Sequence, residues 1–154
     1  MNASVLLSRR IVLAGAALTP LALIGCGGQP AAAGPPEISY GRDTCDRCGM
    51  IISEERFAAA LTSGSGEPML FDDPGELLLT VAEQGRQDRH AWVHDRANGK
   101  WIDATTAAYV RGDDGATPMG TGVVAFAKRE DAAAFRATSG GDVLTWDEAT
   151  QPPA

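Results

Sequence analysis

The sequence predicts an α+β fold in which two small, similar β-β-α-β units pack together after a signal peptide and a flexible tether. In each half a short apolar strand ends in an aromatic residue, Phe71 or Phe126, and a helical pattern follows. Each helical pattern stops at a glycine, Gly85 or Gly140, at the same spacing from its aromatic residue. Units this short bury too little apolar surface to be stable alone, so we expect them to share a core.

Residues 1–25 are predicted to be a signal peptide rather than part of the fold. Arg9 and Arg10 precede an apolar run, residues 11–24, that is shorter than the ~20 residues of a membrane span. An arginine pair in this place fits a twin-arginine signal, and an ordinary Sec signal fits equally well. In both cases the mature chain would be exported from the cytoplasm.

The apolar run ends in the sequence LIGC, which resembles the bacterial lipobox and places Cys26 at the cleavage point. In a lipobox the cut falls before the cysteine, and its thiol then carries lipid. Residues 26–36 are rich in Gly, Pro and Ala, cannot pack a core and are predicted to be a flexible tether. We therefore expect an extracytoplasmic domain that Cys26 anchors to the inner or the outer bacterial membrane.

The chain has 154 residues and a formal net charge of −7. Arg9 and Arg10 would leave with the signal peptide, so the exported part is more acidic still. Neither a basic patch nor a run of interleaved aromatic and arginine residues is present, so nucleic acid is not an expected partner. An acidic surface suits a cation or a basic patch on another protein.

The first unit is expected to span residues 37–96. Residues 56–63 (RFAAALTS) suggest a strand or short helix, and residues 68–71 (PMLF) a short buried strand. Residues 90–95 (HAWVHD) suggest a further strand, and the Asn98-Gly99 pair after it is a strong hairpin signal.

A helix is predicted between the last two of these strands. Asp73 is the expected N-cap, Pro74 the first helical residue and Gly85 the stop. Four apolar residues at helical spacing give the helix one buried face. They are Leu77, Leu78, Val81 and Ala82.

The second unit is expected to span residues 97–150 and to repeat this order. Residues 101–104 (WIDA) follow the Asn98-Gly99 turn and fall within this span, and residues 122–126 (GVVAF) suggest a buried strand. A helix over residues 127–139 ends at a glycine pair, and residues 142–146 (DVLTW) form the last strand.

The stretch TCDRCGM places two thiols, Cys45 and Cys48, beside the thioether of Met50. A thioredoxin-like pair would need a helix N-terminus to lower the thiol pKa, and the residues after Cys48 do not open a helix well. A disulfide would close a very small loop, and covalent haem attachment is excluded because Gly49 follows instead of histidine. Arg47, between the cysteines, is expected to help keep Cys48 ionised.

Zinc would need four Cys or His ligands, and the exported part offers only His90 and His94 besides the two thiols. Both histidines lie on one face of a predicted strand, far along the chain from Cys48. Cu(I) is soft and prefers sulfur ligands. Met119 supplies a further thioether from the loop TPMGTG, where methionine has little packing role, whereas Met69 in PMLF fits a core.

Five stretches, CDRCGMII, FDD, WVHD, WIDATTAAYV and PMGTGVVAF, occur in this order after the lipobox. Together they resemble the NosL family, the copper-binding accessory lipoproteins of nitrous oxide reductase maturation. The resemblance runs from about Cys45 to Trp146 and implies a fold of two similar β-β-α-β units. Some members carry a further cysteine after the first aromatic residue, where this chain has Asp72 and Asp73.

The resemblance implies that the chain binds one Cu(I) and delivers it to a copper ABC transporter or assembly machinery that serves nitrous oxide reductase. The implied ligands are Cys45, Cys48, Met50 and Met119, with His94 of WVHD as a further candidate. No catalytic constellation is evident, so we do not expect an enzyme. The alternative hypothesis is an extracytoplasmic thiol-disulfide protein that uses Cys45 and Cys48 without Met119.

Overall fold

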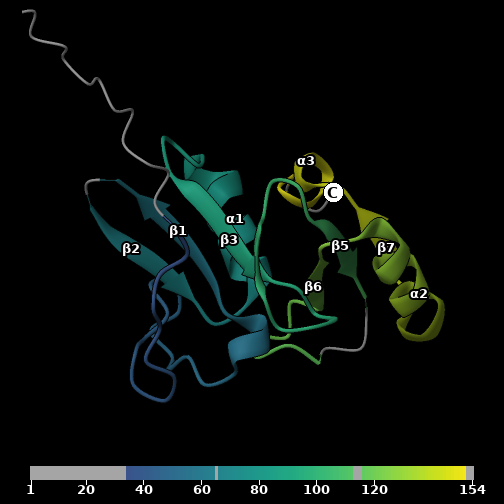
Figure 1. The fold of residues 1–154 in the computed structure, drawn as a ribbon, viewed down its shortest axis with the longest axis horizontal. Coiled ribbons are helices and arrows are strands. Elements are labelled where there is room, and N and C mark those ends of the chain that lie inside the picture. Colours follow the sequence, from purple (N-terminus) through teal and green to yellow (C-terminus); the bar gives the residue numbers. More distant parts are fainter. Residues whose placement is uncertain (1–33, 65, 113–115, 152–154) are drawn as a thin grey trace, which may run out of the picture.

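The computed structural model describes residues 34–151 with the exception of residues 65 and 113–115 (Figure 1). The predicted signal peptide, most of the tether and Cys26 lie outside these residues. The elements in chain order are a 3-10 helix η1 (Glu55–Phe57), β1 (Ala59–Ser63), β2 (Gly66–Phe71), α1 (Pro74–Gln84), β3 (His90–His94), β4 (Trp101–Asp103), β5 (Ala108–Arg111), β6 (Val123–Phe126), α2 (Arg129–Ser139), β7 (Asp142–Leu144) and α3 (Trp146–Ala149). No helix among the described residues is long and apolar enough to cross a membrane.

The strands form two antiparallel sheets, with the order β2-β1-β3-β4 in the first and β6-β5-β7 in the second. The chain therefore runs β1-β2-α1-β3 and then β5-β6-α2-β7, which confirms the predicted α+β class with two similar units. Figure 1 shows the two sheets side by side, with α1 behind the first sheet and α2 and α3 beside the second.

The predicted Asn98-Gly99 hairpin is confirmed. β4 (Trp101–Asp103) pairs with β3 as the edge of the first sheet, with His94 opposite Trp101. Gly99 has a φ of 71° and returns the chain directly onto β3. The second sheet begins with β5, and the approximate boundary between residues 96 and 97 falls within the β3–β4 hairpin.

The last predicted strand is also shorter than expected. β7 ends at Leu144, and Thr145 begins the short helix α3. The Thr145 side chain accepts from the Glu148 backbone, and Glu148 accepts in return from the Thr145 backbone. This capping box was present in the sequence TWDE but was not recognised.

Helix α1 begins and ends where the sequence predicted. Asp73 is the N-cap and accepts a hydrogen bond from the backbone of Gly75 at 2.8 Å, and Pro74 occupies the first turn. Gly85 ends the helix with a φ of 72°, which favours glycine. Of the predicted apolar face, Leu77 and Leu78 are buried, whereas Ala82 is exposed.

The two units share one core, as expected for units of this size. Phe71, Leu77 and Val93 of the first unit belong to the same buried cluster as Tyr109 and Val123 of the second. A backbone bridge also joins the units where the end of the first sheet meets β6, because the Arg96 N–H donates to the Ala125 carbonyl at 2.8 Å. This bridge connects the backbone that follows β3 directly to β6 of the second sheet.

Candidate metal centre

The cysteine loop is a short, hydrogen-bonded turn. Thr44 and Ile51 form a backbone bridge at its base, and the Cys45 N–H donates to the Met50 carbonyl at 2.8 Å. The Gly49 N–H donates to the Cys45 carbonyl at 2.9 Å, and Gly49 has a φ of 76°. Glycine at this position lets the chain turn tightly enough to bring both thiols to the same side.

Asp46 attaches this loop to the outer edge of the first sheet. Its backbone N–H donates to the Leu70 carbonyl at 2.8 Å, and its carboxylate accepts from the Leu70 N–H at 2.6 Å. Leu70 lies in β2, which ends at Phe71 just before α1 begins. The loop therefore delivers its thiols to the junction between β2 and α1.

Four ligand groups meet at this junction. The ligand atoms of Cys45, Cys48, Asp72 and Glu76 all lie within 4.8 Å of one another. The Cys45 thiol donates to Glu76 Oε2 at 2.8 Å, and Cys48 Sγ lies 3.7 Å from Asp72 Oδ1. Cys45, Asp72 and Glu76 are 2%, 3% and 6% exposed, so the group is buried except at Cys48. Both cysteines are free thiols.

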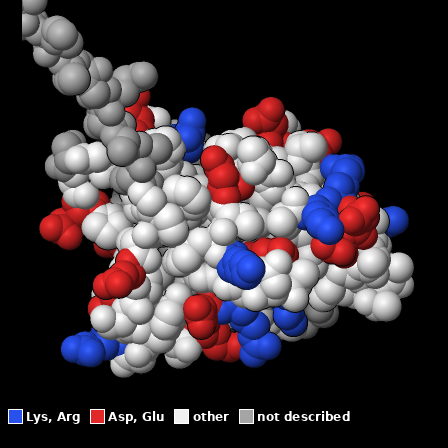
Figure 2. Space-filling view, viewed as in Figure 1, with Lys and Arg blue, Asp and Glu red and all other residues white. Residues whose placement is uncertain are grey.

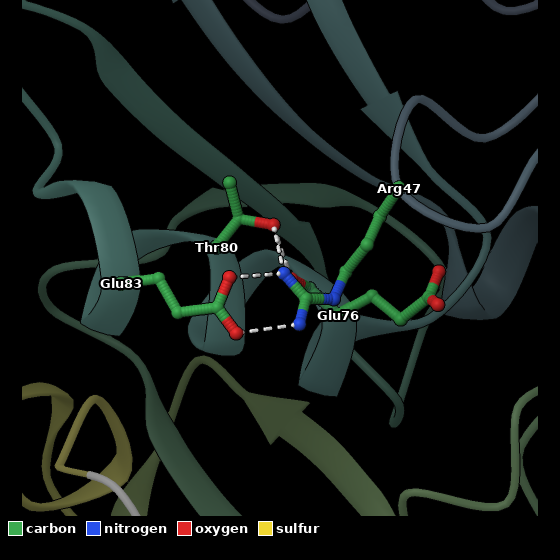
Figure 3. Close-up of polar contacts among 4 residues, drawn as sticks. All are labelled: Arg47, Glu76, Thr80 and Glu83. Carbon is green, nitrogen blue, oxygen red and sulfur yellow. Dashed lines mark hydrogen bonds and ion pairs between the residues drawn. The ribbon is translucent and has the colours of Figure 1, made fainter.

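Arg47 lies between the two cysteines in the sequence, and its side chain contacts helix α1 (Figure 3). Its guanidinium donates to both carboxylate oxygens of Glu83, at 2.9 and 2.7 Å, and to Thr80 Oγ1 at 3.3 Å. Glu76, Thr80 and Glu83 follow one another on the same helix, and Figure 3 shows the Glu76 carboxylate directed away from the Arg47 guanidinium. Arg47 therefore fastens the cysteine loop to α1.

The expectation that Arg47 keeps Cys48 ionised was wrong, because the pKa values of both thiols are raised and favour the protonated form. Burial and the hydrogen bond to Glu76 raise the pKa of Cys45 to about 12. Burial also raises the pKa of Cys48. The pKa of Glu76 is raised by burial and by the neighbouring Asp72 carboxyl. At neutral pH the metal-free site therefore holds its thiol protons, which metal binding would release.

Asp73 binds the Met119 loop of the second unit at the start of α1. Its fully buried carboxylate accepts from the Met119 N–H at 3.1 Å and from the Thr121 hydroxyl, in addition to the Gly75 N–H. Gly75 is required for this packing, because a Cβ there would lie 2.3 Å from Thr121 Oγ1. The Met119 backbone is thus bound to Asp73, the sequence neighbour of Asp72.

The remaining predicted ligands lie outside the group of four. Met50 is 54% exposed on the cysteine loop. His94 is buried, with Nδ1 donating to the Ala58 carbonyl at 2.8 Å and its ring centroid 3.7 Å from that of Trp101. Burial lowers the pKa of His94 and favours the neutral ring. His90 is half-buried on the same strand and is likewise not part of the group.

Asp72 and Glu76 were missed from the sequence. Asp73 was predicted as the helix N-cap, which the structure confirms, whereas the neighbouring Asp72 faces the thiols. The available signal was their spacing. Asp72 directly precedes the N-cap and Glu76 lies in the first helical turn, so both are at the start of α1. That the cysteine loop docks there depends on the Asp46–Leu70 pairing, which no local pattern reveals.

The fold and this group define a class: a small α+β protein with a buried dithiol and carboxylate site suited to a metal ion. The sequence profile of the NosL family matches residues 37–152. The chain belongs to the NosL family.

Two relatives support this assignment. A copper-binding lipoprotein NosL from Stutzerimonas stutzeri is 30% identical over 148 residues, which cover 88% of this chain and 78% of the relative. The crystal structure of the copper chaperone NosL from Shewanella denitrificans is similar with a TM-score of 0.66 and 25% identity, over 74% of this chain and 94% of that one.

Proposed function

We propose that this chain is a membrane-anchored metallochaperone that binds one Cu(I) through Cys45 and Cys48, with thioether ligation from Met119 and Met50. The observation that carries the proposal is the meeting of two free thiols at the start of α1, where Asp73 also holds the Met119 loop. Thiolate and thioether sulfur are the donors that Cu(I) prefers. We leave His94 out of the ligand set because its Nδ1 donates to the Ala58 carbonyl and its ring packs against Trp101.

The proposed cargo route is delivery to a copper ABC transporter or assembly machinery for nitrous oxide reductase or a related extracytoplasmic copper protein. The relatives that are named copper-binding lipoprotein and copper chaperone support a carrier rather than an enzyme. The alternative, thiol-disulfide exchange, requires a reactive thiolate. The raised pKa values of Cys45 and Cys48 disfavour it, and the two cysteines lie in a turn and not at a helix N-terminus.

Metal preference tests this function. The purified, reduced chain should bind about one Cu(I), and an excess of Zn²⁺ should not displace it, because Cu(I) gains most from the two thiolates and the thioethers. Binding is measured by titration in the presence of a chromophoric Cu(I) chelator, with and without Zn²⁺. Loss of bound Cu(I) to equimolar Zn²⁺ would refute the proposal.

Anchoring is tested separately through Cys26, which lies outside the described residues. We propose that lipid on Cys26 holds the domain on the extracytoplasmic side of a bacterial membrane, and the name lipoprotein of the Stutzerimonas stutzeri relative supports lipidation. Cys26→Ser should release the protein into the soluble fraction or leave it unprocessed. A Cys26→Ser protein that fractionates and migrates like wild type would show that Cys26 is not lipidated.

A further inference from the structure

Helix α1 carries apolar residues that the rest of the fold leaves partly open. Leu78 is 2% exposed, but Leu79 is only half-buried and Ala82 is exposed. Ala82 lies at helical spacing from both leucines, so the three side chains share one part of the helix surface. This part of α1 is turned toward the second unit, where it forms one wall of a pocket.

The pocket lies between α1 of the first unit and β5, β6 and the α3 region of the second. Its volume is about 210 Å³, and its apolar lining consists mainly of Leu78, Leu79, Ala82, Val123 and Ala149. An engineered apolar cavity of roughly 150 Å³ stays dry and binds benzene. Because Ala82 and Gln151 are exposed at its edge, the pocket opens to solvent. An apolar group of several carbon atoms can therefore enter it.

Arg111 is the charged side chain among the residues that line this pocket. Its guanidinium donates one of its several N–H groups to the Ala149 carbonyl at 2.9 Å. Asp142 lies opposite Arg111 in the pairing of β5 with β7 but forms no ion pair with it. The ion pairs within the described residues are Arg47–Glu83, Arg56–Glu54 and Lys128–Glu130. The pocket thus presents a positive charge, and no carboxylate of the described residues lines it.

An apolar pocket with one cation suits a ligand that has an apolar body and an anionic end. Arginine pairs well with a carboxylate because its N–H groups match the two oxygens. A peptide segment would bring backbone N–H and C=O groups that need partners when buried. Besides Arg111 the polar lining side chains are Thr121 and Gln151, and the Thr121 hydroxyl already donates to Asp73. A hydrocarbon chain has no such groups to satisfy.

We propose that this pocket binds the hydrocarbon chain of a fatty acid, whose carboxylate pairs with Arg111. The site is separate from the cysteine loop and does not depend on the proposed copper function. It adjoins the link between the units, because Gly75 and Thr121 line the pocket and both donate to Asp73. A bound chain would therefore pack against the contact that joins α1 to the second unit.

Octanoate, kept below the concentration at which it forms micelles, is the probe for this site. Isothermal titration of the purified, metal-free chain measures its affinity. From butanoate to octanoate the affinity should rise about fourfold for each methylene, which corresponds to about 0.8 kcal/mol per buried CH₂. Octanol should bind about tenfold more weakly than octanoate, because it lacks the charge that pairs with Arg111.

Two variants test the two parts of the site. Arg111→Gln should weaken octanoate binding about tenfold and leave octanol binding unchanged, because the charge pairing alone is lost. Arg136→Gln is its matched control, since Arg136 also donates to a backbone carbonyl, that of Gly141, but lies on α2. Ala82→Leu places a larger side chain in the pocket and should weaken the binding of both ligands. Ala133→Leu, at an exposed position of α2, is the control for this change.

Four results would overturn the proposal. The first is wild-type protein that does not bind octanoate, and the second is unchanged octanoate affinity in both Arg111→Gln and Ala82→Leu. The third is octanoate binding that appears only after deletion of residues 152–154, because that segment would then be the occupant of the pocket. The fourth is an octanoate affinity that falls as the protein concentration rises, which would assign the pocket to a second copy of the chain.

A measurement on wild-type protein removes any dependence on how the variants fold. Nuclear Overhauser effects should connect the octanoate methylenes with the methyl groups of Leu79 and Val123, which line the pocket. Met50 and Ile51 are exposed apolar side chains elsewhere on the surface. Effects to these two residues without effects to Leu79 would show adsorption to exposed apolar surface and would overturn the proposal.

Discussion

Cys48→Ser is expected to weaken Cu(I) binding by more than the roughly 10–100-fold that loss of a supporting residue causes at metal sites. The substitution replaces a soft thiolate with a hard hydroxyl, and Cys45 then remains as a single thiolate. Cys48 is the more informative of the two cysteines because it is partly exposed, whereas Cys45 is buried and bonded to Glu76. Affinity is measured by competition with a chromophoric Cu(I) chelator.

Thermal melts of the metal-free proteins serve as the control for Cys48→Ser. The Cys48 thiol is half-buried and its contact with Asp72 Oδ1 is long, at 3.7 Å, so the melting temperature should change little. Cu(I) affinity equal to that of wild type would remove Cys48 from the site and leave Cys45 with the thioethers as the ligands.

Asp73→Ala is expected to have the largest effect on stability, about 2–4 kcal/mol of the free energy of unfolding. Loss of an N-cap costs about 1 kcal/mol. The remainder comes from the Met119 N–H and the Thr121 hydroxyl, which lose a buried carboxylate acceptor. The same variant should weaken Cu(I) binding, because Asp73 no longer holds the Met119 loop at the start of α1. Denaturant unfolding and Cu(I) titration measure the two effects.

Two further variants separate the cap from the link to Met119. Asp73→Ser keeps a capping oxygen but is too short to hold the second loop, so it should recover about 1 kcal/mol without recovering Cu(I) affinity. Lys128 occupies the N-cap of α2 and makes no side-chain capping bond, so Lys128→Ala should change neither quantity. An Asp73→Ser protein with full Cu(I) affinity would show that Asp73 acts only as a cap.

The elements that sequence patterns predicted correctly are those with local signals. The N-cap, Pro74 and Gly85 define α1 within one stretch of chain, and the Asn98-Gly99 turn defines the β3–β4 hairpin. The approximate boundary between the units, at residues 96 and 97, divides this hairpin, because the boundary followed the order of the two patterns whereas the turn decides the strand pairing. The four-residue strand β5 has no turn signal immediately before it and was missed.

The site was also predicted only where its residues belong to a local motif. The thiols were predictable because C-x-x-C is a local motif, whereas the carboxylates join them only through the docking of the loop on β2. The direction of Arg47 likewise depends on Glu83, which lies on a helix distant in sequence. Figure 2 shows acidic and basic side chains interspersed on the face that it draws.

Met119→Ala tests most directly the central claim that sulfur from both units holds one Cu(I). The measurement is a Cu(I) competition titration against a chromophoric chelator, with Met69→Ala in β2 as a methionine control and apo melts for both proteins. Met119→Ala should weaken Cu(I) binding markedly at little cost in stability, because this half-exposed loop side chain buries little area. If Met119→Ala binds Cu(I) like wild type, the two-unit site is wrong, and Cys45, Cys48 and Met50 bind the ion alone.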